Sequence, residues 1–400
     1  MTADLLSALA AIGQASDYPD HTYTFLACDL LTDQVIAELP LQQVQYERVL
    51  SGIGTLTAFL PLADETLPLD PITATTGGRT ALYVDRDGVI VWGGIIWTRR
   101  PAPGGVTIQA AEFLSYYQHR YITQTLSTVA ANVTDTDLVP NGQLLYGDQK
   151  WMMWSLFQWA ALSPGGNIGI DINLLGGAAD GITREATFFG YERPELFATM
   201  QQLSQADNGF DFAIEVGWNP IHNNEAPTRY RRARTYFPQR GRSAVDSGLV
   251  FSKGGPAASI VAYDWPEDWT SMATRTYALG GGDGEARLIA QGVDADLLMS
   301  GWPLLESVAT YSGVTQLATL QGHANADIIT RSGAAVAPTF DVLADGDPAF
   351  GTYTEGDRAI FSIAPEPRFP DGLDVELRIL GVQVTAARGP EIVRLTCTGA

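Results

Sequence analysis

Short apolar runs separated by turn residues dominate the first third of the chain. Seven of these runs are rich in β-branched and aromatic side chains, which is typical of β-strands. They cover residues 22–28, 34–39, 44–50, 54–60, 81–84, 89–98 and 106–110. Asp87-Gly88 lies between two apolar runs and predicts a tight hairpin. Most runs start about 8 to 12 residues apart, a spacing that favours a barrel or a sandwich.

The period of the pattern changes in the middle third. Residues 150–160 are apolar nearly all round, which predicts a buried helix. Residues 194–206 carry an apolar stripe at helical spacing, and Pro194 suits the first position of the helix that we expect there. Asn208-Gly209 ends this helix, and residues 210–216 then alternate as a strand does.

Strand patterns return in the last part of the chain. The runs are 249–251, 260–263, 274–279, 359–363, 373–380, 382–385 and 392–398. Between them, residues 312–332 have the pattern of a helix. Two β-rich blocks therefore flank a mixed insert, and the predicted fold class is mainly β with an α+β insert.

Composition adds limits to this picture. The 400 residues include 45 acidic and 24 basic side chains, so the net charge is −21 and the surface repels nucleic acid and anionic lipid. With 46% hydrophobic residues the chain has enough apolar surface to fold, and its length predicts two or three units. No apolar run approaches 18 residues, so we expect no membrane anchor. The opening residues lack the basic start of a signal peptide.

The sequence contains no established catalytic or metal-binding signature. Its four histidines are isolated, and neither a zinc-protease motif, nor a Cys-x-x-Cys pair, nor a serine-hydrolase elbow is present. Cys28 and Cys397 exclude a disulfide framework and leave one long-range bridge open. The glycine cluster at 280–285 lacks the basic residue of a phosphate loop and is interpreted as a surface loop. We therefore predict no catalytic residue, no metal and no cofactor.

Acidic pairs keep one enzyme class open, because glycoside hydrolysis requires two carboxylates across a cleft. The candidate pairs are Glu267 with Asp268, Asp294 with Asp296, and Asp345 with Asp347. Trp265 and Trp269, on either side of the first pair, have the side chains that stack on sugar rings. Asp and Glu in turns usually serve the backbone, and aromatic residues beside a turn usually anchor a core.

One segment is strongly basic. Residues 229–242 contain six arginines and no acidic residue, which leaves −27 for the rest of the chain. These arginines are Arg229, Arg231, Arg232, Arg234, Arg240 and Arg242. One interpretation is a solvated strand or loop. The other is a contact surface for an acidic neighbour, most simply another copy of this chain, or for the phosphates of passing DNA.

Three motifs resemble those of a known family. The first is the opening sheet, residues 44–57 and 80–96, with Trp92-Gly93-Gly94 and then residues 111–117. The second is the helix end at 203–206 that passes through Asn208-Gly209 into a strand. The third is the segment 353–359 before the last strands. In layout the chain resembles the tail hub, or baseplate hub, proteins of long-tailed phages, specifically the minor tail proteins of siphophages that infect actinobacteria.

The resemblance implies two tube-like β-barrel domains with smaller mixed domains between them. The chain then divides into an N-terminal segment (1–20), a first β-barrel (21–122), a mixed α/β insert (123–245) and a second β-rich region with a terminal barrel (246–400). Three subunits would present six barrels and adapt a sixfold tail tube to a threefold tip.

The implied function is structural and not enzymatic, at the tail tip of the virion. The implied partners are two further copies of the chain, the distal tail or tail tube proteins and other tail-tip proteins, while DNA passes through the lumen without specific binding. A hexameric distal tail protein is the alternative within the same machine. A cell-wall carbohydrate-active enzyme is the alternative of another class.

Overall fold

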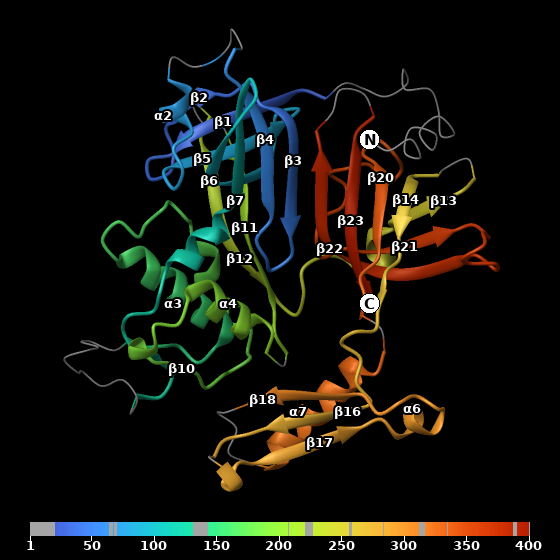
Figure 1. The fold of residues 1–400 in the computed structure, drawn as a ribbon. Coiled ribbons are helices and arrows are strands. Elements are labelled where there is room, and N and C mark those ends of the chain that lie inside the picture. The colour runs from blue at the N-terminus through green and yellow to red at the C-terminus, as the bar shows by residue number, and fades with distance from the viewer. Residues whose placement is uncertain are drawn as a thin grey trace. The chain divides into compact units, whose positions relative to one another are not determined.

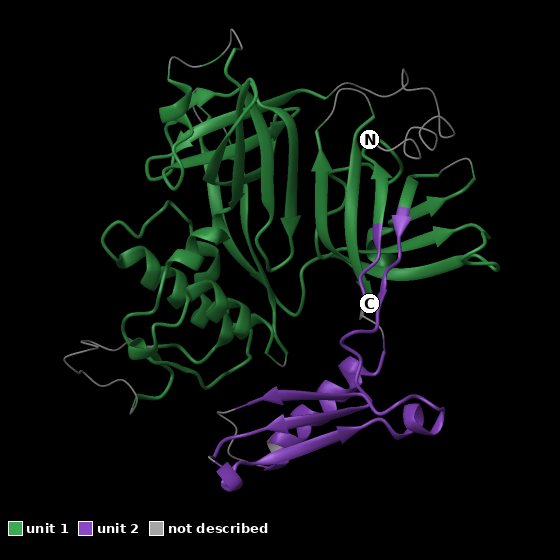
Figure 2. Cartoon of the chain, viewed as in Figure 1, with its two compact units in different colours: residues 1–262, 340–398, 400 green, residues 263–339, 399 purple. Residues whose placement is uncertain are grey.

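The computed structural model describes residues 21–63, 67, 70–130, 143–206, 208–220, 227–255, 258–282, 284–311, 317–333, 335–386 and 390–399. The predicted N-terminal segment, 1–20, lies outside the described residues. The chain forms two compact units, which Figure 2 distinguishes by colour. Unit 1 comprises residues 1–262 and 340–398, and unit 2 comprises residues 263–339. The predicted second β-rich region therefore contains an insert that forms a compact unit of its own.

A 13-stranded sheet is the main element of unit 1 (Figure 1). Its strands are β1 (Tyr23–Asp29), β2 (Val35–Glu38), β3 (Gln42–Val49), β4 (Thr55–Pro61), β5 (Thr80–Arg86), β6 (Val89–Ala102), β7 (Gly105–Glu112), β13 (Val250–Lys253), β14 (Ile260–Asp264), β20 (Thr339–Leu343), β21 (Arg358–Ile363), β22 (Leu373–Thr385) and β23 (Ile392–Gly399). Their order is β14-β20-β23-β22-β3-β4-β7-β6-β5-β1-β2, and β21 pairs with both β22 and β13.

The predicted hairpin at Asp87-Gly88 is confirmed. Both residues adopt positive φ, and the Gly88 N–H donates to Asp85 Oδ1 at 2.7 Å, which closes the turn between β5 and β6.

Strand β22 connects the two β-rich blocks. Residues 373–378 pair with β21 of the last block, and residues 381–385 pair with β3 of the first block. The mainly β fold is confirmed. The described pairings form one open path from β14 to β2, and no closed barrel is found among them. Two tube-like barrels therefore remain a prediction.

The insert contributes helices and a hairpin to unit 1. The longer helices are α3 (Gln149–Leu162) and α4 (Leu196–Ser204), and β11 (Asp211–Trp218) pairs with β12 (Arg229–Tyr236). The short elements are α2 (Pro71–Ala74), α5 (Ala244–Ser247), β8 (Leu126–Ser127), β9 (Gln143–Leu144), β10 (Thr187–Phe188) and the 3-10 turns η2 (Phe113–His119), η4 (Asn173–Gly176) and η5 (Gly190–Glu192).

The predicted buried helix is confirmed, since Met152, Met153 and Leu156 of α3 are fully buried in one core with Leu196 and Met200 of α4.

Helix α4 starts later than the sequence predicts. Glu195, in extended conformation, is its N-cap, so Pro194 lies outside the helix. The Pro194 carbonyl accepts a hydrogen bond from Ile122, and Leu196 N–H donates to the Arg120 carbonyl, both at 2.9 Å. This bridge keeps the approach to the helix extended.

The main elements described in unit 2 are a small sheet and the helix that packs on it. The strands follow the order β17 (Ile289–Val293), β16 (Arg275–Leu279) and β18 (Glu306–Thr310), and α7 (Leu317–Arg331) packs on one face through Leu320 and Ala324. The predicted helix is confirmed over these residues, and 312–316 lie outside the described part. The remaining elements are β15 (Glu267–Asp268), β19 (Ala335–Val336), α6 (Ala295–Met299) and η6 (Gly284–Ala286).

Cys28 and Cys397 are both buried and free, so the long-range bridge that the sequence left open is not formed. Within the described ranges, no helix has both the length and the apolar character needed to cross a membrane.

We expect Phe361→Ala to destabilise unit 1 by about 3–5 kcal/mol. Phe361 is fully buried between Phe251 and Phe340, with ring centroids 5.2 and 4.1 Å away, so truncation leaves a cavity. Val250→Ala is the control, because Val250 is 48% exposed on the neighbouring strand β13. Urea unfolding measures both variants, and an equal, small loss for the two would contradict this description of the core.

Candidate functional site

The six arginines of the basic segment do not form one exposed surface. Four lie on β12, and the other two follow in the loop toward α5. The side chains of Arg229, Arg231 and Arg240 are only 6%, 4% and 12% exposed. Arg232, Arg234 and Arg242 are 32%, 40% and 47% exposed. Three of the six arginines of the predicted contact surface are thus buried within the chain, where carboxylates and carbonyl oxygens of the same chain accept their hydrogen bonds. A contact role for the exposed three remains a prediction.

Arg231 holds the insert hairpin against the first block. Its guanidinium donates to the Tyr83 hydroxyl at 2.6 Å, to the carbonyls of Leu30 and Ile168 at 2.8 and 2.6 Å, and to the Asp33 carboxylate at 2.7 Å. A buried charge is tolerated only when it is paired and hydrogen-bonded in this way. Position 231 therefore requires arginine, whose planar guanidinium donates several hydrogen bonds at once.

Asp33 receives a second arginine. Arg229 Nε lies 3.1 Å from Asp33 Oδ2, and the Tyr83 hydroxyl donates to Oδ1 at 2.8 Å. Asp33 lies between β1 and β2 with φ of 56°. Nothing in the local sequence distinguishes Asp33 from other turn aspartates, so its pairing with two arginines could not be predicted from the sequence.

Arg240 and Arg242 connect the insert to the last block. Arg240 pairs with the Glu355 carboxylate, and Arg242 Nη2 lies 2.8 Å from Asp357 Oδ2. The backbone joins the same contact, since the Arg358 N–H donates to the Arg242 carbonyl at 2.9 Å. We call residues 240–242 against 355–357 the clasp. Both of its carboxylates belong to the third motif of the sequence analysis, where no role was assigned to them.

The middle residue of each half of the clasp is a glycine. Gly241 and Gly356 adopt φ of 96° and 99°. A Cβ on Gly241 would lie 2.1 Å from the Gly356 carbonyl carbon, and one on Gly356 would lie 2.7 Å from the Arg240 carbonyl oxygen. The two backbones approach so closely that only glycine fits at either position.

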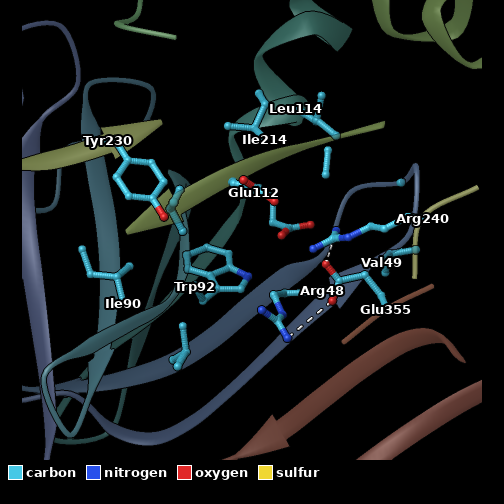
Figure 3. A pocket seen from close by; sticks show the side chains of 15 residues that line it. Arg48, Val49, Ile90, Trp92, Glu112, Leu114, Ile214, Tyr230, Arg240 and Glu355 are labelled. Atoms are coloured by element: carbon cyan, nitrogen blue, oxygen red, sulfur yellow. Dashed lines mark hydrogen bonds and ion pairs between the residues drawn. The ribbon is translucent and has the colours of Figure 1, made fainter. Parts of the chain in front are cut away.

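A pocket of about 240 Å³ lies beside the clasp (Figure 3). Arg240 and Glu355 line it together with Arg48 and Glu112. Arg48 Nη2 lies 3.4 Å from Glu355 Oε2, so Glu355 contacts two arginines. Glu112, at the end of β7, accepts a hydrogen bond from the Gly54 N–H at 2.7 Å. The pocket is therefore lined by opposite charges that come from the first block, the insert and the last block.

The pKa values of Glu112 and Glu355, two of the carboxyl groups that line this pocket, shift in opposite directions. Burial raises the pKa of Glu112 to about 8, because its Gly54 hydrogen bond and the arginines compensate incompletely. Burial acts on Glu355 too, but Arg48 and Arg240 outweigh it and lower the pKa of Glu355. Acid–base enzymes use such divergent pairs. Here Glu355 is held by two arginines, which indicates a structural role.

A second group of polar contacts joins the first block directly to the last block. Arg86 Nη2 lies 2.8 Å from the buried Glu391 carboxylate, and His21 contacts Asp87 at 2.7 Å and Asp345 at 3.0 Å. Burial tends to lower the pKa of His21, but hydrogen bonds to both aspartates raise it overall.

Members of the candidate acidic pairs serve the fold, as turn residues usually do. Asp345 pairs with His21, and Asp294 caps α6 by accepting from Leu297 N–H at 3.0 Å. Glu267 and Asp268 are exposed neighbours on β15. Hydrogen bonds from the hydroxyl and N–H of Thr270 lower the pKa of Asp268, whereas a general acid needs a raised pKa.

Metal ligands do not converge in the part of the chain that the structure describes, where no group of three or more His, Cys, Asp or Glu side chains is placed to hold an ion. The His119 ring lies tilted against Trp97 and the His323 ring stacks on Tyr311, with ring centroids 4.4 and 4.3 Å apart. His222 lies outside the described residues.

The fold of the whole chain is similar to that of solved tail proteins. A tail protein from Neisseria meningitidis MC58 matches with a TM-score of 0.54 and 11% identity, over 94% of this chain and 96% of that one. The 43 kDa tail protein of prophage MuSo2 from Shewanella oneidensis matches with a TM-score of 0.57 and 10% identity, over 94% and 97%. This chain has the fold of these tail proteins.

A chain of the Francisella PdpA–VgrG complex also matches, with a TM-score of 0.50 and 7% identity, over 98% of this chain and 60% of that one. No protein-family model and no curated protein matches the sequence.

We predict that Gly356→Ala destabilises unit 1 far more than Gly351→Ala. Both glycines adopt φ of 99°, so both variants carry a backbone strain of about 1–2 kcal/mol. Only Gly356 also meets the backbone of Arg240, since no atom lies within 4 Å of a Cβ on Gly351. Overpacking of this kind adds about 1–3 kcal/mol. Urea unfolding compares the two, and equal losses would show that the clasp does not constrain the backbone.

Glu112→Gln should remove part of the pH dependence of stability. The folded pKa of Glu112, about 8, lies above its ordinary 4.5, so ionisation favours the unfolded chain. The parent therefore loses up to about 1.4 kcal/mol per pH unit between pH 5 and 8, and the variant loses less. Urea unfolding at pH 5, 6, 7 and 8 measures the slope, with Glu38→Gln, at an exposed site on β2, as the control. Parallel curves for parent and Glu112→Gln would contradict the burial of this carboxyl.

Proposed function

We propose that this chain is the structural hub of a phage tail tip and connects the tail tube to the tip and its receptor-binding apparatus. The observation that carries the proposal is the near full-length match in fold to two tail proteins, one of them from a prophage. The polar site supports it, since its ion pairs join segments of unit 1 and both carboxylates of the clasp pair with arginines. The proposed role is structural, without enzymatic activity or cofactor.

The proposed assembly is a homotrimer in which each copy contributes two tube-like barrels, one from residues 21–122 and one from the region 246–400. The insert 123–245 would hold the two barrels in place through Arg231, which contacts the first block, and through the clasp, which contacts the last block. The shared strand β22 supports this arrangement, because it fixes the register between the blocks. Three copies then present six similar blocks to a sixfold tube.

The proposed partners are other copies of the chain, distal tail or tail tube proteins and further tail-tip proteins within the virion. A net charge of −21 supports a lumen that lets DNA pass without holding it. Arg229, Arg231 and Arg240 pair with carboxylates within the chain, so their positive charges are not available to hold passing DNA. Arg232, Arg234 and Arg242 are the proposed contacts to a neighbouring copy.

We expect a mass of about 129 kDa for the assembly in solution, three times the 43.0 kDa of one chain. Light scattering coupled to size exclusion measures it. A hexamer would instead identify the distal tail alternative. Release of sugar or peptide from cell walls, abolished by Glu267→Gln or Asp268→Asn, would overturn the structural role in favour of the enzyme.

A further inference from the structure

Two tryptophans of unit 2 stack on each other at the protein surface. The ring centroids of Trp269 and Trp302 lie 5.3 Å apart, with 26° between the ring planes. Trp269 follows β15 and Trp302 follows α6, so two separate loops supply the rings. The residues remain 46% and 38% exposed. Burial of such a side chain normally stabilises a protein by about 1.5–3 kcal/mol, so two exposed ones in contact indicate a binding surface.

Backbone hydrogen bonds hold both loops at the two tryptophans. The Trp302 N–H donates to the Leu297 carbonyl at 3.1 Å, and the Trp269 carbonyl accepts from Met272 N–H at 3.2 Å. Met272 and Ala273 are buried directly after the exposed run that holds Trp269. The stack is therefore formed before any ligand arrives, which reduces the entropy lost on binding.

The two loops of the stack are acidic, and Arg331 of α7 donates from its Nη1 to the Ser271 carbonyl at 3.3 Å. The loops 264–274 and 294–305 contain no Lys, Arg or His, while Glu267 and Asp268 are exposed next to Trp269. Thr270 fixes the Asp268 carboxylate through its N–H at 2.8 Å and its hydroxyl at 2.6 Å. Carboxylates accept hydrogen bonds from hydroxyl groups and repel phosphates and other anions. The chemistry suits a neutral ligand rich in hydroxyls.

The exposed aromatic area is small. A tryptophan contributes at most about 250 Å², so the exposed parts of the two residues amount to about 200 Å². A stable protein interface needs about 800 Å² on each side. The stack matches the face of one or two sugar rings, whose C–H groups pack against indole.

We propose that Trp269 and Trp302 form a binding surface for a neutral saccharide, with the adjacent carboxylates as hydrogen-bond acceptors. This site binds and does not hydrolyse, since the lowered pKa of Asp268 keeps it ionised, which suits a hydrogen-bond acceptor and not a general acid. The inference rests on unit 2 alone and stands or falls independently of the number of copies in the assembly.

Affinity electrophoresis of the full chain through gels containing dextran, galactan or mannan tests the proposal, with heparin as the anionic comparison. We expect at least one neutral polysaccharide, and not heparin, to retard the parent. Trp269→Ala and Trp302→Ala should each weaken retardation at least tenfold. Trp269→Phe should retain most of it, because Phe also stacks. Ile329→Ala, at a 76% exposed position of α7, should behave as the parent.

Size exclusion of the same variants separates a saccharide from a protein partner. Met299 and Leu304 are also exposed, at 78% and 50%, and would widen the surface for a second chain. An unchanged assembly mass together with lost retardation supports the saccharide site. Failure of all three neutral polysaccharides to retard the folded parent would overturn it. A smaller assembly in Trp269→Ala and Trp302→Ala would also overturn it and place the stack between subunits.

Discussion

Unit 1 depends on buried arginines that pair with carboxylates from distant parts of the chain. Arg231 joins the insert to the first block, and the clasp joins the insert to the last block. A buried ion pair adds little net stability, but removal of one partner costs about 3–5 kcal/mol, because the other charge is left unpaired. These contacts therefore specify how the three segments fit together. The hydrophobic cores of the blocks and of the insert supply the stability.

The backbone reinforces the same arrangement. Strand β22 pairs with both blocks, and the glycines of the clasp allow two loops to approach more closely than any side chain would permit. Strand pairing and paired charges together fix how the segments of unit 1 fit together. A fixed geometry suits a part that lies between a tube and a tip, which is the role proposed for this chain.

Much of the local structure could be predicted from the sequence, because local rules govern it. The Asp87-Gly88 hairpin, the buried helix α3 and helix α7 follow from turn chemistry and apolar periodicity. The site could not be predicted in this way. Arg240 and Glu355 are 115 residues apart, and an arginine-rich strand has the same sequence whether it faces solvent or internal carboxylates. The compact unit 263–339 was also missed, since its strands resemble those on either side.

The ion pairs change the interpretation of the basic segment, residues 229–242. Half of the arginines of the basic segment are largely buried and make ion pairs within the chain, so the segment does not form one exposed surface of positive charge. The central claim is that this chain forms the hub of a tail tip. A cryo-EM reconstruction of the tip of a particle that carries the chain tests it most directly. The account predicts three copies around the tail axis at the end of the tube, and six copies or none at that position would contradict it.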